Sequence, residues 1–203
     1  MTDYKRPGLV FSDVERLREL GRKVGPIQFI FAGKAHPHDA RGQEIIRSIH
    51  RAATQLGRDV PVVFIEDFGI GIARHLVAGS DLWLNNPRPP LEASGTSGMK
   101  AALNGVPSLS TLDGWWLEGW VEGRTGWAIG EPGDDVTYAD NTPAMDAAHA
   151  ESLYHKLEHA VLPAWNAGDE AWAEIMRASI ALNGSYFTTE RMVSEYALRA
   201  YVR

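Results

Sequence analysis

The residues best suited to chemistry lie between Leu91 and Gly105, where a loop of hydroxyl and glycine residues leads into an apolar helical run. The loop Ser94–Gly98 contains only serine, glycine and threonine, and Lys100 follows one helical turn after Thr96. Glycine permits close backbone approach, and the first turn of a helix leaves N–H groups unpaired, so this junction suits an anion, above all phosphate. Helical side chains lean toward the N-terminus, so we expect the Lys100 amine to return to the loop.

Two chemical roles are open for this lysine. It is either a counter-charge to a bound phosphate or an amine that forms an imine with an aldehyde cofactor. Glycine- and serine-rich loops before helices are common, however, and most of them bind nothing. Spacing alone therefore favours a structural loop with a solvated lysine.

Other candidate groups are weaker. His36 and His38 share a loop in which no third residue completes a ligand set, and His155 and His159 share a helix face but lack a Glu partner of metalloprotease type. No metal site is therefore predicted, and the second pair is expected to be a surface pair. The carboxylates of Glu66–Asp67 end a predicted strand, where they suit either acid–base chemistry or a strand-end cap.

The composition bounds the class of protein. The chain has 203 residues, a formal net charge of -6 and no cysteine. An acidic chain argues against a nucleic-acid or anionic-membrane surface, and the lack of cysteine excludes disulfides and thiolate metal sites. No apolar run reaches membrane-spanning length. We expect a soluble, cytoplasmic, globular protein.

Apolar strands that alternate with amphipathic helices predict an α/β fold with a Rossmann-like parallel sheet. The strands are apolar throughout and are expected to be buried on both faces. In such sheets, ligands bind outside the carboxyl ends of the strands, which is where the loops described above lie. The expected strands are Ile27–Ala32, Val60–Glu66, Leu82–Leu84 and Val106–Ser110, and the expected helices are Leu9–Leu20, Gln43–Leu56 and Ile70–Ala78.

The second half of the chain is expected to be mainly helical. Residues 1–143 are predicted to form the Rossmann-like domain, and residues 144–203 a helical extension that packs on it. Ser12 and Glu15 suit a capping box that would start the first helix near Asp13. The other expected elements are an aromatic, glycine-rich segment at Asp113–Gly130, a surface loop at Glu131–Pro143, and helices at Ala144–Ala160, Asp169–Leu182 and Thr189–Val202, with a break at Pro163–Gly168 and a cap at Thr188 or Thr189.

The segment Leu91–Gly114 closely resembles the cofactor segment of the glycogen/α-glucan phosphorylases. Further matches extend the likeness nearly end to end, in the bacterial short form of the family. They are Tyr4–Arg6, Phe31–Pro37, Trp83–Pro87, Gly126–Ile129 and Arg191–Tyr196.

This resemblance implies a cofactor site. Lys100 matches the family lysine that holds pyridoxal 5'-phosphate as a Schiff base. Thr96, Ser97 and Gly98 match positions that grip the cofactor phosphate. In the family, this phosphate assists proton transfer through the substrate phosphate, while the imine supplies no electron sink.

The resemblance also implies substrate-binding positions. Glu92, Ser94 and Gly95 match residues that contact the glucosyl hydroxyls, and Lys5 matches a catalytic lysine near the two facing phosphates. The family reaction is the reversible phosphorolysis of α-1,4-glucan by inorganic phosphate, which gives α-glucose 1-phosphate with retention. No metal is implied, and the resemblance allows a homodimer.

Some features depart from the family pattern. The chain resembles only the C-terminal domain of a GT-B type glycosyltransferase, so the N-terminal phosphorylase domain is expected as a missing partner, together with an arginine upstream of Met1. Phe68 and Gly69 stand where relatives carry a tyrosine and a further side chain. Trp115 and Trp116 are expected on the face that the missing domain would cover.

Three hypotheses follow from these matches and departures. The chain is the cofactor domain of a glucan phosphorylase, active only with its missing half. Alternatively, it is a catalytically incomplete fragment that binds pyridoxal phosphate or a sugar phosphate without turnover. In the third case, it is a silent fragment whose cleft face serves association.

Overall fold

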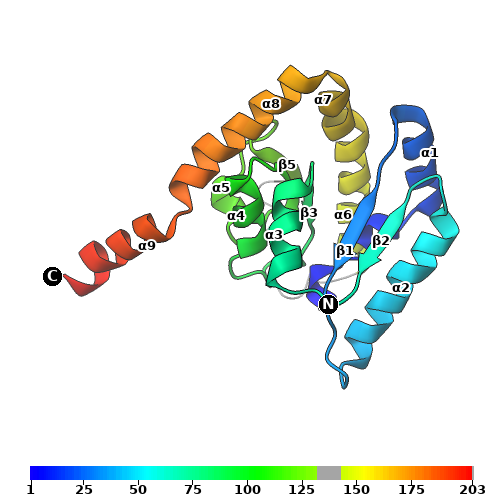
Figure 1. Ribbon diagram of the computed structural model, residues 1–203, viewed down its shortest axis with the longest axis horizontal. Helices are drawn as coiled ribbons and strands as arrows, with labels where there is room; N and C mark the ends of the chain where they lie inside the picture. The colour runs from blue at the N-terminus through cyan, green and yellow to red at the C-terminus, as the bar shows by residue number, and fades with distance from the viewer. Residues whose placement is uncertain (132–142, 203) are drawn as a thin grey trace.

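The computed structural model describes residues 1–131 and 143–202 and confirms the α/β class (Figure 1). Helices flank parallel strands, and the C-terminal part is helical. The strands are β1 (Phe29–Ala32), β2 (Val62–Ile65), β3 (Trp83–Asn85), β4 (Ser108–Thr111) and β5 (Gly126–Ile129).

The strands form two parallel sheets. One sheet has two strands in the order β1-β2, with Phe29 opposite Val62, and the other has three in the order β3-β4-β5, with Trp83 opposite Ser108. β5 is absent from the predicted strands because it lies in the glycine- and tryptophan-rich segment, where periodicity carries little signal.

Helices cover these sheets and continue into the C-terminal part. In the described residues, no helix is both long and apolar enough to span a membrane. The helices are α1 (Val14–Val24), α2 (Ala40–Leu56), α3 (Ile70–Gly79), α4 (Thr96–Leu103), α5 (Trp116–Gly119), α6 (Pro143–Lys156), α7 (Leu162–Asn166), α8 (Asp169–Ala178) and α9 (Thr189–Tyr196), with 3-10 turns at Asp3–Lys5 and Leu9–Phe11 and π-helical turns at Leu157–Val161, Ser179–Gly184 and Ala197–Tyr201.

Several predicted helix boundaries are wrong. The capping box is absent, because the Ser12 hydroxyl donates to Leu9 O at 2.6 Å and the Asp13 side chain instead caps α1 by accepting from Arg16 N at 2.9 Å. Likewise, Pro163 does not break the helix, because a proline in the first turn needs no N–H partner. The predicted Thr188 cap of α9 is confirmed by its bond from Arg191 N at 3.2 Å.

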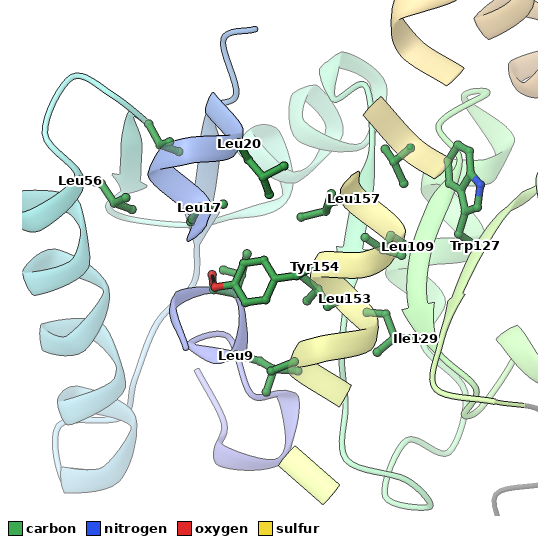
Figure 2. Packing of buried hydrophobic residues seen from close by; sticks show 14 of the residues in the cluster. Leu9, Leu17, Leu20, Leu56, Leu109, Trp127, Ile129, Leu153, Tyr154 and Leu157 are labelled. Carbon is green, nitrogen blue, oxygen red and sulfur yellow. Dashed lines mark hydrogen bonds between the residues drawn. The ribbon is translucent and has the colours of Figure 1, made fainter. Parts of the chain in front are cut away.

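The main core joins the two sheets to α1, α2, α6 and α8 (Figure 2). Tyr154 of α6 lies at its centre and is 2% exposed. The Tyr154 hydroxyl donates to Val10 O at 2.7 Å and accepts from Asp13 N at 3.0 Å, which ties α6 to the turn before α1. Desolvation by burial raises the pKa of this phenol to about 12.

The two strands of the first sheet are less buried than expected. Ile30 in β1 is 47% exposed and Val63 in β2 is 40% exposed, and these residues lie opposite each other in register. The prediction of burial on both faces is therefore wrong for β1 and β2, and also for β3, whose residues are all half-buried. It holds for β4, in which every residue is buried. β5, where no strand was predicted, is buried at every residue as well.

A second, smaller core contains the tryptophan pair. Trp115 is 3% exposed and Trp116 is fully buried, packed with Ala102 of α4 and with Phe187. The expectation that these tryptophans wait on a face for a missing domain is wrong, because the C-terminal residues of this chain cover them. The predicted loop at Glu131–Pro143 lies, apart from its two ends, outside the described residues.

Candidate functional site

The predicted loop and helix form an open helix terminus. Gly95 precedes α4 in the left-handed conformation, with φ 88°, a backbone state that favours glycine. In the described part of the chain, no side chain caps the first turn of α4. Thr96, exposed, and Ser97, half-buried, therefore present their hydroxyls beside free helical N–H groups, an arrangement that suits a phosphate oxygen.

Trp115 packs against this terminus. The backbone N–H of Trp115 donates to Ser94 O at 2.8 Å. A Cβ added at Gly98 would lie 2.7 Å from Trp115 Nε1, and one at Gly95 would lie 3.0 Å from Trp115 Cδ1. Glycine is thus required at Gly98 for the indole to reach the helix, and the loop conformation depends on this contact. Phe187 packs on the same indole edge-to-face, with ring centroids 5.1 Å apart.

Lys100 lies where its spacing predicts. Its ammonium donates to Thr96 Oγ1 at 3.2 Å, so the amine does return to the first turn of α4. The Lys100 side chain is exposed. An exposed amine beside an uncapped helix N-terminus is accessible both to an aldehyde and to a phosphate.

Lys5 and Glu92 form an ion pair beside this terminus. Glu92 is 9% exposed, and its N–H donates to Asp113 Oδ2 at 2.8 Å. Burial lowers the pKa of Lys5, while the charge of Asp113 opposes that shift. Burial raises the pKa of Asp113, opposed by the Gly114 N–H and by Lys5. Both groups are thus biased toward their neutral forms, and an added anion near Lys5 would favour its charged form.

Arg6 positions the turn that carries Lys5. This residue is 6% exposed and donates from Nε to Asn86 O and from Nη2 to Pro87 O, both at 2.9 Å. Its Nη1 donates to Asp146 Oδ1 at 2.8 Å. The guanidinium therefore ties the N-terminal turn to the end of β3 and to α6.

The structure brings together most of the predicted site residues. Glu92, Ser94 and Gly95 lie on the loop before α4, and Lys5 reaches that loop through Glu92. Lys100 bonds to Thr96, whereas Lys5 pairs with Glu92, so the two lysines belong to separate sets of contacts. Sequence reasoning missed Asp113, Trp115 and Arg6 as part of this site; for Asp113, the only signal was its place three residues after the end of the predicted strand Val106–Ser110.

The alternative sites have simpler explanations. His36 and His38 pack ring against ring at 5.4 Å, and residues 1–131 and 143–202 contain no group of three or more possible metal ligands. Asp67 is 94% exposed and bonds Lys34 at 2.8 Å, a hydrogen bond that lowers the pKa of the Asp67 carboxyl. This carboxylate is paired at the surface rather than poised as a general base.

Comparison with known proteins agrees with these features. A family model described as Carbohydrate phosphorylase matches residues 2–122. The chain is 43% identical over 199 residues to maltodextrin phosphorylase of Thermococcus litoralis, covering 98% of this chain and 23% of that protein. It is 44% identical over 207 residues to glycogen phosphorylase of Aquifex aeolicus, covering 99% of this chain and 29% of that protein.

A third relative, glycogen phosphorylase of Mycobacterium tuberculosis, is 40% identical over 98% of this chain and 23% of its own length. The chain thus spans about a quarter of the length of the curated relatives it matches. The family model covers more than half of the chain, and the uncapped α4 terminus with its lysine lies inside the matched range. The chain belongs to the carbohydrate phosphorylase family.

Proposed function

We propose that this chain is the cofactor-binding part of an α-1,4-glucan phosphorylase of GT-B type, which works in the cytoplasm. The observation that carries the proposal is the Lys100 ammonium, held 3.2 Å from Thr96 Oγ1 at an uncapped helix N-terminus. Residues 1–143 would supply the cofactor site, and residues 144–203 would brace it. The missing N-terminal phosphorylase domain would complete the cleft for glucan and inorganic phosphate.

The residues at the terminus of α4 fit pyridoxal 5'-phosphate. Lys100 would carry the cofactor, and Thr96, Ser97 and the N–H groups beside Gly98 would hold its phosphate. When bound, the cofactor supplies a phosphate group that can exchange a proton with the substrate phosphate.

Glu92 and its neighbours on the loop would bind the glucosyl unit. The bond from Glu92 N to Asp113 orients this residue, and the buried Glu92 carboxylate would accept hydrogen bonds from glucosyl hydroxyls. Ser94 and Gly95 present backbone groups on the same loop. Lys5 would leave Glu92 to neutralise phosphate, whose negative charge would favour the charged form of this lysine.

The cofactor assignment is tested by incubating the chain with pyridoxal 5'-phosphate, reducing with borohydride and mapping the adduct by mass spectrometry. We expect the label on Lys100 and its loss in Lys100→Arg, which keeps the charge but removes the primary amine. Lys23→Arg is the matched control, because Lys23 is 73% exposed and lies far away in the sequence on α1. Equal labelling of Lys100 and Lys23 would show ordinary surface reactivity instead of a site.

The second candidate is a fragment that binds the cofactor without turnover. The chain spans about a quarter of its relatives, and we expect no measurable glucose 1-phosphate from glycogen and phosphate with this chain alone. Turnover by the isolated chain would refute the need for a missing half. Failure to label Lys100 would leave the third hypothesis, an association surface without catalysis.

A further inference from the structure

A pocket of about 310 Å³ lies beside the two N-terminal 3-10 turns. This volume is at the lower end of the range for small-molecule sites, roughly 300–1,000 Å³. The walls of the pocket come from both turns, α2, the loop after β3 and the first turn of α6, and Figure 2 shows the turn with Leu9 between α2 and α6. The described residues that line it include none of those that we propose for the cofactor or the sugar.

The charged side chains that line this pocket carry an excess of positive charge. They are the cations Arg6, Arg41 and Arg88 and the anions Asp3 and Asp146. The carboxylates join the arginines into one network: Asp3 pairs with Arg41 at 2.8 Å and lies 3.9 Å from Arg88, and Asp146 pairs with Arg88 and with Arg6, each at 2.8 Å. A concave surface with one sign of charge in excess concentrates ions of the opposite sign, so the pocket favours an anion.

Two of these arginines keep donors for a ligand. Arg6 bonds protein acceptors through all three of its nitrogens and is part of the wall. Arg41 places Nε and Nη2 on one oxygen, Asp3 Oδ1, at 3.0 and 2.8 Å, which leaves Nη1 for a further acceptor. Arg88 bonds Asp146 through Nη2, and its buried Nε has no hydrogen-bond partner among the described residues. A buried unpaired donor costs free energy, so the Arg88 guanidinium gains from an acceptor that a ligand brings.

Two serine hydroxyls add acceptors to the pocket. Ser12 Oγ donates to Leu9 O at 2.6 Å, and Ser48 Oγ donates to Ile45 O at 2.7 Å. A hydroxyl that donates to the backbone retains its lone pairs, so both serines line the pocket as acceptors. Arginine, by contrast, only donates, and its planar fork matches the oxygens of a phosphate. A sugar phosphate fits both kinds of group, because its phosphate accepts hydrogen bonds and its hydroxyls donate them.

We infer that this pocket binds a sugar phosphate, with Arg41 and Arg88 on the phosphate and with Ser12 and Ser48 accepting from the sugar hydroxyls. The negative charge of the ligand offsets the excess positive charge of the lining, and its oxygens supply acceptors for the two guanidinium groups. The inference does not rest on the proposed function. The pocket and the α4 terminus have no described residue in common, so the pocket would bind its ligand whether or not Lys100 carries a cofactor.

The test is isothermal titration calorimetry of the full chain in a phosphate-free buffer of low ionic strength. The probes are fructose 6-phosphate, inorganic phosphate and fructose. We expect fructose 6-phosphate to bind more tightly than either of the other two probes. Arg41→Gln is expected to weaken its binding at least about fivefold, because it removes a charged donor from the phosphate. Arg47→Gln is the matched control, because Arg47 lies on the same helix, has a side chain that is 61% exposed and is not part of the pocket lining.

Thr96→Ala separates this pocket from the α4 terminus. We expect this variant to bind fructose 6-phosphate as the wild type does. Binding that is lost in Thr96→Ala but kept in Arg41→Gln would place the ligand at the α4 terminus. That result would overturn the inference and leave the cofactor proposal standing, whereas failure to label Lys100 would overturn the cofactor proposal alone.

Ser48→Ala tests the sugar part of the ligand. It is expected to weaken fructose 6-phosphate about threefold and to leave inorganic phosphate unchanged, because it removes one neutral acceptor. If Arg41→Gln fails to fold, Arg41→Lys keeps the charge but loses the forked donors, and it is expected to weaken fructose 6-phosphate as well. No binding of fructose 6-phosphate, unchanged affinity in the Arg41 variant, or inorganic phosphate that binds as tightly as the sugar phosphate would each overturn the inference.

Discussion

The close contact between Gly98 and Trp115 predicts that Gly98→Ala destabilises the protein. In Gly98→Ala, the new Cβ would lie 2.7, 2.9 and 3.0 Å from Nε1, Cζ2 and Cε2 of the indole. The indole has little room to retreat, because Trp116 and Phe187 pack against it with ring centroids 5.1 Å away in each case. The rigid ring, unlike the end of a flexible side chain, must shift together with its neighbours.

Two opposing effects set the change in the free energy of unfolding of Gly98→Ala. Alanine in place of glycine inside a helix stabilises it by about 0.8–1 kcal/mol. Overpacking a tight contact costs about 1–3 kcal/mol, and three rigid ring atoms place this case in the upper part of that range. The net loss in the free energy of unfolding is therefore about 1–2 kcal/mol, which corresponds to a fall in Tm of about 2–8 °C for a chain of this size.

Gly71→Ala is the matched control, because Gly71 also lies in the first turn of a helix and an added Cβ there meets nothing within 4 Å. Thermal unfolding of both variants is compared with the wild type. We expect Gly71→Ala to be unchanged or slightly more stable, and Gly98→Ala to lose both stability and labelling of Lys100. Combining Gly98→Ala with Trp115→Leu should cost at least about 1 kcal/mol less than the sum of the single changes. A Gly98→Ala variant as stable as Gly71→Ala would refute the account of this contact.

Two further predictions concern the core and its ion pairs. Burial raises the pKa of Asp146, but the hydrogen bonds from Arg88 and Arg6 outweigh it and hold that pKa below the ordinary value of 3.8. The stability that this carboxylate contributes is therefore present above about pH 4 and is lost as the pH falls through its lowered pKa. Asp146→Asn should lower Tm at pH 7, and the Tm values of the variant and the wild type should converge in acid. Tyr154→Phe should lower the free energy of unfolding, measured by chemical denaturation, by about 1–2 kcal/mol, because it leaves the Asp13 N–H without its partner. As a control, removing the hydroxyl of a half-exposed tyrosine should change this free energy little.

Local patterns predicted much of the fold. Amphipathic spacing identified the helices near their observed positions, and Asp13 and Thr188 are both caps because their short side chains accept from the helix backbone. β5 escaped prediction because Gly126–Ile129 is short and adjoins turn-forming glycines. The 3-10 turn at Leu9–Phe11 shares its apolar spacing with a helix, so periodicity alone did not separate the two.

In the candidate site, too, local contacts were predicted and contacts between distant residues were not. The α4 terminus and the return of Lys100 to Thr96 depend on residues four apart, and they were predicted from spacing. Asp113 reaches Glu92 across 21 residues, and Arg6 reaches Asn86 across 80. Contacts over such separations depend on how strands and helices pack, and no local pattern encodes them.

The sequence by itself determined the elements with local causes: the loop of small residues, the helix that follows it, the lysine one turn along, and the acidic, cysteine-free composition. Only the tertiary structure decided that Trp115 and Trp116 are buried beneath that loop, and that Ile30 and Val63 lie exposed on a two-stranded sheet. The reason is physical. An apolar side chain has the same local preference whether its partner is present or absent, and burial is decided by which other segments fill the space beside it.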